Sequence, residues 1–169
     1  MGGVFPFGRG ARQNLRMGES GWRWSDAWIF VSLVIASGAG RHRRSPSSRR
    51  PEGIRLTDVL STADHLNQAI PERHEVEEAV RRLVGAGLVD VADGWFRITP
   101  DGERLWRTRP SAGLATTVDT VQGVLSRRQP PVSADWHLDE ADHAAAVQEY
   151  LVRSIPAPRR SPENRAHRD

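Results

Sequence analysis

The sequence predicts a mainly α-helical protein with a small β-hairpin, in which two C-terminal helices follow the hairpin-containing domain. Three observations predict this class. Apolar residues recur every three or four positions in several segments, which is the spacing of one helix face. Two short runs of β-prone residues flank Asp93-Gly94, a dipeptide that favours a tight hairpin turn. Glycine and proline interrupt the chain between these segments, as they do between secondary-structure elements.

The chain has 169 residues, which suits one domain with tails. We expect a disordered leader over 1–21, a hairpin-containing domain over 22–108 with a basic loop at 38–53, a helical extension over 109–155 and a disordered tail over 156–169. The leader and the tail are rich in Gly, Pro and Arg and lack apolar periodicity. Met17 is an alternative start to Met1. The absence of cysteine excludes disulfides, thiolate zinc sites and cysteine nucleophiles.

The first predicted helix spans Ser25 to Ser37. Ser25 is its expected N-cap, and Asp26 lies in its first turn, where a carboxylate suits the helix dipole. The run Ala27–Ala36 is apolar on every side, which predicts a central helix packed all round. Read from Met17, the same run could be a signal peptide. A buried helix explains it better, because Asp26 directly precedes the run and the run is too short to span a bilayer.

A helix pair is predicted next. A short edge strand is expected at Ile54–Leu56, and Thr57 is expected to cap a second helix that ends near Ile70. A third helix follows from Glu72 to Ala86. Its apolar positions recur at helical intervals, and Gly87 stands where a C-terminal glycine stop belongs.

The predicted hairpin pairs Leu88–Val91 with Trp95–Thr99. Thr99 also has the position of an N-cap for a fourth helix, because Pro100 follows it and proline is favoured at the first helical position. This fourth helix runs through Trp106.

Two helices are predicted after the hairpin domain. In the first, apolar residues step by four, three and four positions, and they are Leu114, Val118, Val121 and Leu125. This narrow seam fits either a homodimer contact or packing against the protein's own domain. Gln129-Pro130-Pro131 breaks it. The last helix is predicted from Trp136 to Arg153, capped by Ser133 or Asp135.

Three segments carry a resemblance to a known family. They read IRLTDVL (54–60), RRLVGAGLVDV (81–91) and WFRITPDGERL (95–105). They resemble the winged helix-turn-helix domains of MarR- and PadR-like regulators. The chain is also similar to small actinobacterial proteins of unknown role, which share its SDAW, LTDVLSTADHLNQAIP and WHLDEADHAAAVQEY segments. The resemblance covers Ser25 to about Leu151 and implies a winged helix-turn-helix domain, whose wing is the β-hairpin, plus two C-terminal helices.

The resemblance implies a DNA-binding transcriptional regulator, because the third helix of such a domain enters the major groove and the wing flanks it. The expected DNA contacts are Arg73, His74 and Arg81 on the third helix, Arg97 on the wing and Arg55 near the DNA backbone. Carboxylates oppose this expectation. The front of the third helix carries Glu72, Glu75, Glu77 and Glu78, and the wing tip carries Asp93.

The charge pattern supports an alternative function. Net charge is +3 and every basic residue is Arg, yet segment 54–108 has ten acids against seven arginines, a balance of −3. An acidic third helix could therefore serve a protein–protein interaction module that faces a basic partner. A third interpretation is purely structural. The glutamates then stabilise the helix through its dipole and through pairs from Glu77 to Arg81 and from Glu78 to Arg82.

No catalytic pattern is present, and we predict a protein that is not an enzyme and uses no cofactor. No glycine-rich phosphate loop follows a strand, and no serine lies in a nucleophile context. His143 and Asp139 are four residues apart but lack a third ligand at a set spacing, so no metal site is predicted. Trp28 and Trp106 are expected in the core. We expect a cytoplasmic protein that does not contact membranes.

Overall fold

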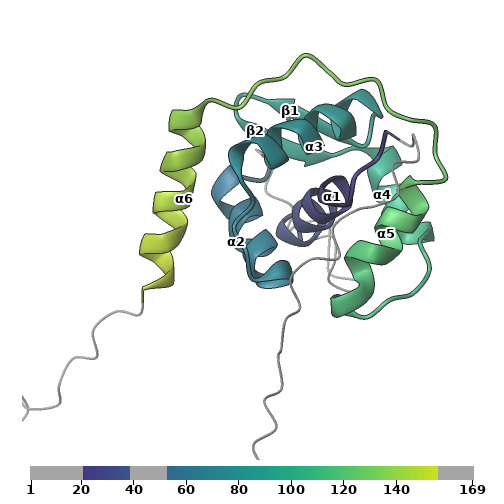
Figure 1. The fold of residues 1–169 in the computed structure, drawn as a ribbon, viewed down its shortest axis with the longest axis horizontal. Helices are drawn as coiled ribbons and strands as arrows, with labels where there is room; N and C mark the ends of the chain where they lie inside the picture. The colour runs from purple at the N-terminus through teal and green to yellow at the C-terminus, as the bar shows by residue number, and fades with distance from the viewer. Residues whose placement is uncertain (1–20, 39–52, 156–169) are drawn as a thin grey trace, which may run out of the picture.

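The computed structural model describes residues 21–38 and 53–155. Within them lie six α-helices and one antiparallel hairpin (Figure 1). The mainly helical class with a small hairpin is therefore confirmed. The predicted leader, basic loop and tail fall almost entirely outside the described residues. No helix in the described ranges is long and apolar enough to cross a membrane.

Helix α1 (Trp24–Ala36) is the centre of the molecule, as its apolar run predicts. Every residue from Asp26 to Val34 is buried, and α1 packs against α2, α3 and α5 (Figure 1). The predicted N-cap was wrong by two residues. Arg23 caps the helix, because the Asp26 carboxylate turns back to accept a hydrogen bond from the backbone N–H of Arg23 at 2.7 Å.

Helices α2 (Leu56–Asn67) and α3 (Arg73–Gly85) follow. Arg55, not Thr57, caps α2, and the helix ends three residues before Ile70 because Gln68 adopts a left-handed conformation with φ 54°. Glu72 caps α3, and the Glu75 carboxylate accepts from the Glu72 backbone N–H at 2.9 Å. Gly87 lies just beyond the end of α3 and has a φ of 69°, so it marks the end of this helix, as predicted.

Strands β1 (Val89–Ala92) and β2 (Trp95–Ile98) form the hairpin, with Val91 opposite Phe96. Asp93 and Gly94 both have positive φ, as a two-residue turn of this kind requires. The predicted edge strand is reduced to a single bridge between Ile54 and Phe96, because Leu56 already begins α2.

Helix α4 (Pro100–Thr108) begins as predicted, and the Thr99 hydroxyl accepts from the Gly102 backbone N–H at 3.1 Å. A short 3-10 turn, η2 (Leu114–Thr116), then leads into α5 (Thr117–Leu125). Three of the four seam residues, Val118, Val121 and Leu125, are buried in the core that α5 shares with α1, whereas Leu114 is 67% exposed. The structure therefore supports packing within the chain for these three, and a homodimer stays a prediction.

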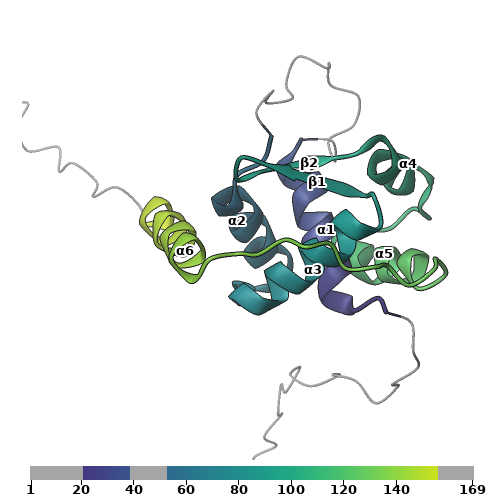
Figure 2. The same ribbon diagram turned by 90° about the horizontal axis from the view of Figure 1, so that it is seen from above.

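The last helix differs most from its prediction. Helix α6 is Glu140–Ser154, capped by Asp139, so it begins four residues after Trp136. Residues 129–139 form no helix, and we call them the strap. Figure 2 shows this segment crossing α3 on its way from α5 to α6. The predicted helix from Trp136 to Arg153 includes Trp136 and Leu138, but both pack from an extended segment.

Candidate interaction surface

The strap runs along α3 and makes a regular set of contacts with it. The backbone N–H of Ala134 donates to the Arg81 carbonyl at 2.9 Å, and the Arg81 Nε donates to the Ala134 carbonyl at 3.0 Å. One turn nearer the start of α3, the Leu138 N–H donates to Glu77 at 3.1 Å and the Leu138 carbonyl accepts from Arg73 at 3.0 Å. The strap therefore uses both the backbone and the charged side chains of α3.

The contacted residues of α3 are evenly spaced. Arg73, Glu77, Arg81 and Gly85 lie four residues apart, and Gly85 lies so close to Val132 that a Cβ there would be 1.6 Å from the Val132 carbonyl oxygen. Twelve helical residues rise about 18 Å. Six extended residues of the strap span roughly 20 Å. The two segments therefore match in length and run in opposite directions.

Glu77 is the electrostatic centre of this contact. Its carboxylate accepts from the Leu138 N–H and pairs with Arg73 at 2.6 Å and with the His137 Nδ1 at 3.0 Å. The Leu138 hydrogen bond and the nearby His137 and Arg73 charges hold the pKa of Glu77 below its ordinary value. The predicted pair between Glu77 and Arg81 was wrong, because each of these side chains is turned toward the strap.

The other three glutamates of α3 also have partners within the chain. Glu72 contacts His74 at 3.2 Å, and Glu75 completes the capping box described above. Glu78 pairs with Arg23 and, as predicted, with Arg82, at 3.5 Å. All four carboxylates thus serve the fold of α3 and its neighbours. This is what the structural interpretation expects.

Arg82 forms a buried ion pair that local sequence patterns do not reveal. Its Nε donates to both oxygens of Asp26 at 2.9 Å, and the Asp26 side chain is fully buried. Burial raises the pKa of Asp26, whereas the hydrogen bonds from Arg82 and from the Arg23 backbone oppose this change. The sequence offers one signal for this pair. Asp26 directly precedes an apolar helix, and a carboxylate buried there needs a cation as its partner.

Helix α6 is held to α2 by polar contacts. Glu149 accepts hydrogen bonds from the Thr57 hydroxyl at 2.7 Å and from Arg55 at 2.9 Å. The hydrogen bond from Thr57, together with that from Arg55, lowers the pKa of Glu149. Tyr150 donates to Asp64, and this bond raises the pKa of Tyr150. At the start of α6, the His143 ring bonds to the Pro71 carbonyl at 3.1 Å. His143 therefore has a structural partner.

The five residues predicted to contact DNA do not form an open basic surface. Arg73 and Arg81 are engaged by the strap, and Arg55 is engaged by α6. His74 is exposed but lies beside Glu72. Arg97 is exposed on β2, opposite Asp90 across the hairpin. Three of the five candidates are thus held by the C-terminal extension.

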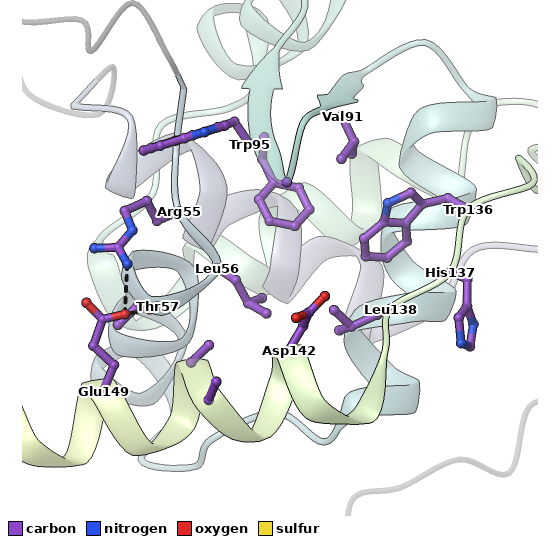
Figure 3. A pocket seen from close by; sticks show the side chains of 14 residues that line it. Arg55, Leu56, Thr57, Val91, Trp95, Trp136, His137, Leu138, Asp142 and Glu149 are labelled. Atoms are coloured by element: carbon purple, nitrogen blue, oxygen red, sulfur yellow. Dashed lines mark hydrogen bonds and ion pairs between the residues drawn. The ribbon is translucent and has the colours of Figure 1, made fainter.

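A cleft of about 570 Å³ lies between the hairpin and α6 (Figure 3). We call it the hairpin–α6 cleft. Its apolar lining comes from Trp95 and Phe96 of the hairpin, Leu56 of α2 and Trp136 of the strap. The rings of Phe96 and Trp136 meet edge to face with centroids 5.9 Å apart. Trp95 and Trp136 thus lie between the hairpin and α6.

Charged groups line the other side of this cleft. Arg55 and Glu149 pair with each other at one end, and Asp142 points from α6 into the cleft between Leu56 and Leu138 (Figure 3). In the part of the chain that the structure describes, no group of three or more metal-ligating side chains is placed to hold a metal ion. Comparison of the chain with protein families, curated proteins and solved structures finds no match.

Proposed function

We propose that residues 22–108 form a winged helix-turn-helix domain that acts as a non-enzymatic interaction module and binds a protein partner. The order of elements supports the fold, since a helix, a bridged extended residue, two helices and a hairpin follow one another. One observation carries the function. The strap covers the helix that would otherwise read DNA and engages two of its three arginines, Arg73 and Arg81.

Electrostatics supports the same proposal. A helix that enters the major groove needs free cations to meet phosphates and base edges. The front of α3 instead holds four carboxylates, and its three arginines are engaged within the chain by Glu77, by the Ala134 carbonyl and by Asp26. Arginines in the leader, loop and tail can still attract DNA through counterion release without reading its sequence.

The second candidate is a DNA-binding transcriptional regulator whose third helix is released when the strap moves. Two observations favour it, namely the winged-helix order of elements and the strap's attachment through polar contacts with Leu138 as its one buried residue. In that case Arg73 and Arg81 would become available to DNA together.

A selection from random DNA duplexes separates the two candidates. Three full-length proteins are compared across a range of salt concentrations. They are the wild type, Gly85→Ala, which places a Cβ against the strap, and the same variant with Arg73→Ala and Arg81→Ala. Hydrogen exchange at the Ala134 amide reports whether the strap has left α3.

The interaction module is supported if all three proteins bind duplexes alike, without an enriched sequence and with equal salt dependence. It is overturned if Gly85→Ala selects a defined sequence and the two alanine substitutions abolish that selection. They would also reduce the salt slope by about two charges. That result would establish the masked regulator.

A further inference from the structure

We infer that the hairpin–α6 cleft is a binding site for an arginine side chain presented by a partner protein. The inference rests on the proposed interaction module and adds the chemistry of its partner. It begins with Asp142. Among residues 21–38 and 53–155, the Asp142 carboxylate has no hydrogen bond or ion pair; Asp142 is exposed and faces a cleft lined with aromatic and aliphatic groups (Figure 3).

The other charged groups of the cleft are already satisfied. The Glu149 carboxylate accepts hydrogen bonds from Arg55 and Thr57 and pairs with Arg153. Arg55 is therefore already paired with a carboxylate. The lining therefore has one carboxylate in excess, and a cation is the group that complements it. A purely apolar occupant would remove water from Asp142 without replacing its hydrogen bonds, which is costly.

The shape of the lining favours arginine over lysine. Trp136 offers an indole next to Asp142, and Leu56 and Leu138 flank the carboxylate (Figure 3). A planar guanidinium can stack on an indole and donate two parallel hydrogen bonds to a carboxylate at the same time. The ammonium group of lysine is not planar and cannot donate two parallel hydrogen bonds in this way. Trp95, at the Arg55 end of the cleft, is placed to contact the remainder of the partner segment.

The site is assembled from three parts of the chain that meet only in the fold. The strap supplies Trp136, α6 supplies Asp142 and α2 supplies Leu56. The strap that covers α3 thus builds one wall of the cleft. The position of the strap therefore both covers α3 and completes the cleft.

The test uses the full-length protein labelled with 15N and the probe N-acetyl-arginine-N-methylamide. The signal observed is the indole N–H of Trp136, identified by its loss in Trp136→Phe. We expect it to shift and saturate with an affinity on the order of millimolar, as one side chain would give. The buried Trp28 indole should not move.

Two controls isolate the charge. The citrulline analogue keeps the shape of the probe but is neutral, and we expect it to leave the Trp136 signal unchanged. Asp142→Asn should abolish the shift caused by the arginine probe, whereas Asp135→Asn, an exposed strap residue outside the cleft, should preserve it. The wild-type comparison of the two probes does not depend on how any variant folds.

Equal shifts from the two probes, or an unchanged shift in Asp142→Asn, would overturn the inference. The outcome is independent of the duplex selection. If no arginine-specific shift is seen and the selection also finds no DNA sequence, the cleft inference fails while the interaction module stands. If the selection finds a sequence, the proposed function fails whatever the probe does at the cleft.

Discussion

Arg82 and Asp26 illustrate how single residues hold this fold together. A charge that is nine-tenths or more buried is costly unless a partner and further hydrogen bonds meet it, and here Arg82 and the Arg23 backbone do so. The pair joins α3 to the central helix α1. Its value lies less in net stability than in the cost of breaking it, since either partner alone would be a buried, unpaired charge.

We therefore expect Arg82→Met to reduce the free energy of unfolding by about 3–5 kcal/mol, because it leaves the Asp26 carboxylate buried and unpaired. The double variant Asp26→Asn with Arg82→Met should be less destabilised than Arg82→Met alone. Urea unfolding measures both. Arg107→Met, which removes an exposed pair with Glu103, is the control and should cost less than about 1 kcal/mol. Additive effects of the two substitutions would contradict this account.

Glu77 gives a prediction that depends on pH. Its folded-state pKa lies below the ordinary value of 4.5, so its charge stabilises the folded state above that value. This contribution is lost as pH falls through the folded pKa. We expect the difference in unfolding free energy between the wild type and Glu77→Gln to be largest near about pH 7 and to shrink toward about pH 3. A difference that stays constant over this range would show that the Glu77 charge does not hold the strap.

The contact between the strap and α3 depends on Gly85, although the backbone conformation at this position does not require a glycine. Gly85 is the last residue of a helix, where alanine is normally better by up to about 1 kcal/mol. The carbonyl of Val132 occupies the place of the missing side chain. Close approach of the strap is therefore the physical reason for glycine at this position.

The stability changes caused by Gly85→Ala in α3 and by Gly123→Ala in α5 should have opposite signs. Gly123 lies in α5 with open space around it, so Gly123→Ala should raise stability by up to about 1 kcal/mol. Gly85→Ala should instead displace the strap and speed hydrogen exchange at the amides of Ala134 and Leu138. If Gly85→Ala stabilises the protein and leaves these amides protected, the strap does not pack as described.

Helix boundaries show what could be predicted from the sequence at this scale. Thr99, Pro100 and Gly87 act within one turn of their own position, so their roles were read correctly. The burial of α1 followed from the uniform apolar character of its residues. The start of α6 was misplaced because Trp136 and Leu138 continue a plausible helical pattern. Their packing partners, Phe96 and α3, are distant in sequence.

The candidate site belongs to the scale of the whole molecule, and this explains why the sequence did not reveal it. Its contacts join Arg55 to Glu149, Arg81 to Ala134 and Arg73 to Leu138, which are separated by 94, 53 and 65 residues. Periodicity and capping report only on near neighbours. Of the arginines predicted to contact DNA, Arg55, Arg73 and Arg81 are half-buried. That they are engaged by the C-terminal extension could be known only from the fold.

The difference in burial between α1 and α6 predicts which part of the protein opens first. Helix α1 is buried along nine consecutive residues, whereas α6 has only two buried residues, Ala146 and Tyr150. Local opening requires the loss of only the contacts that a segment makes. We expect α6 and the strap to exchange their amide hydrogens through a partial opening that leaves α1 protected until global unfolding.

Native-state hydrogen exchange at low urea concentrations measures this difference directly. Glu149→Ala removes the acceptor shared by Arg55 and Thr57, so it should speed exchange throughout α6 without changing exchange in α1. Gln148→Ala, at an exposed position of the same helix, should change neither. Exchange of α6 and α1 with a common free energy would mean that the extension is part of the core. A lower value shared by the amides of α6 and those of Ala134 and Leu138 in the strap would mean that α6 and the strap open together.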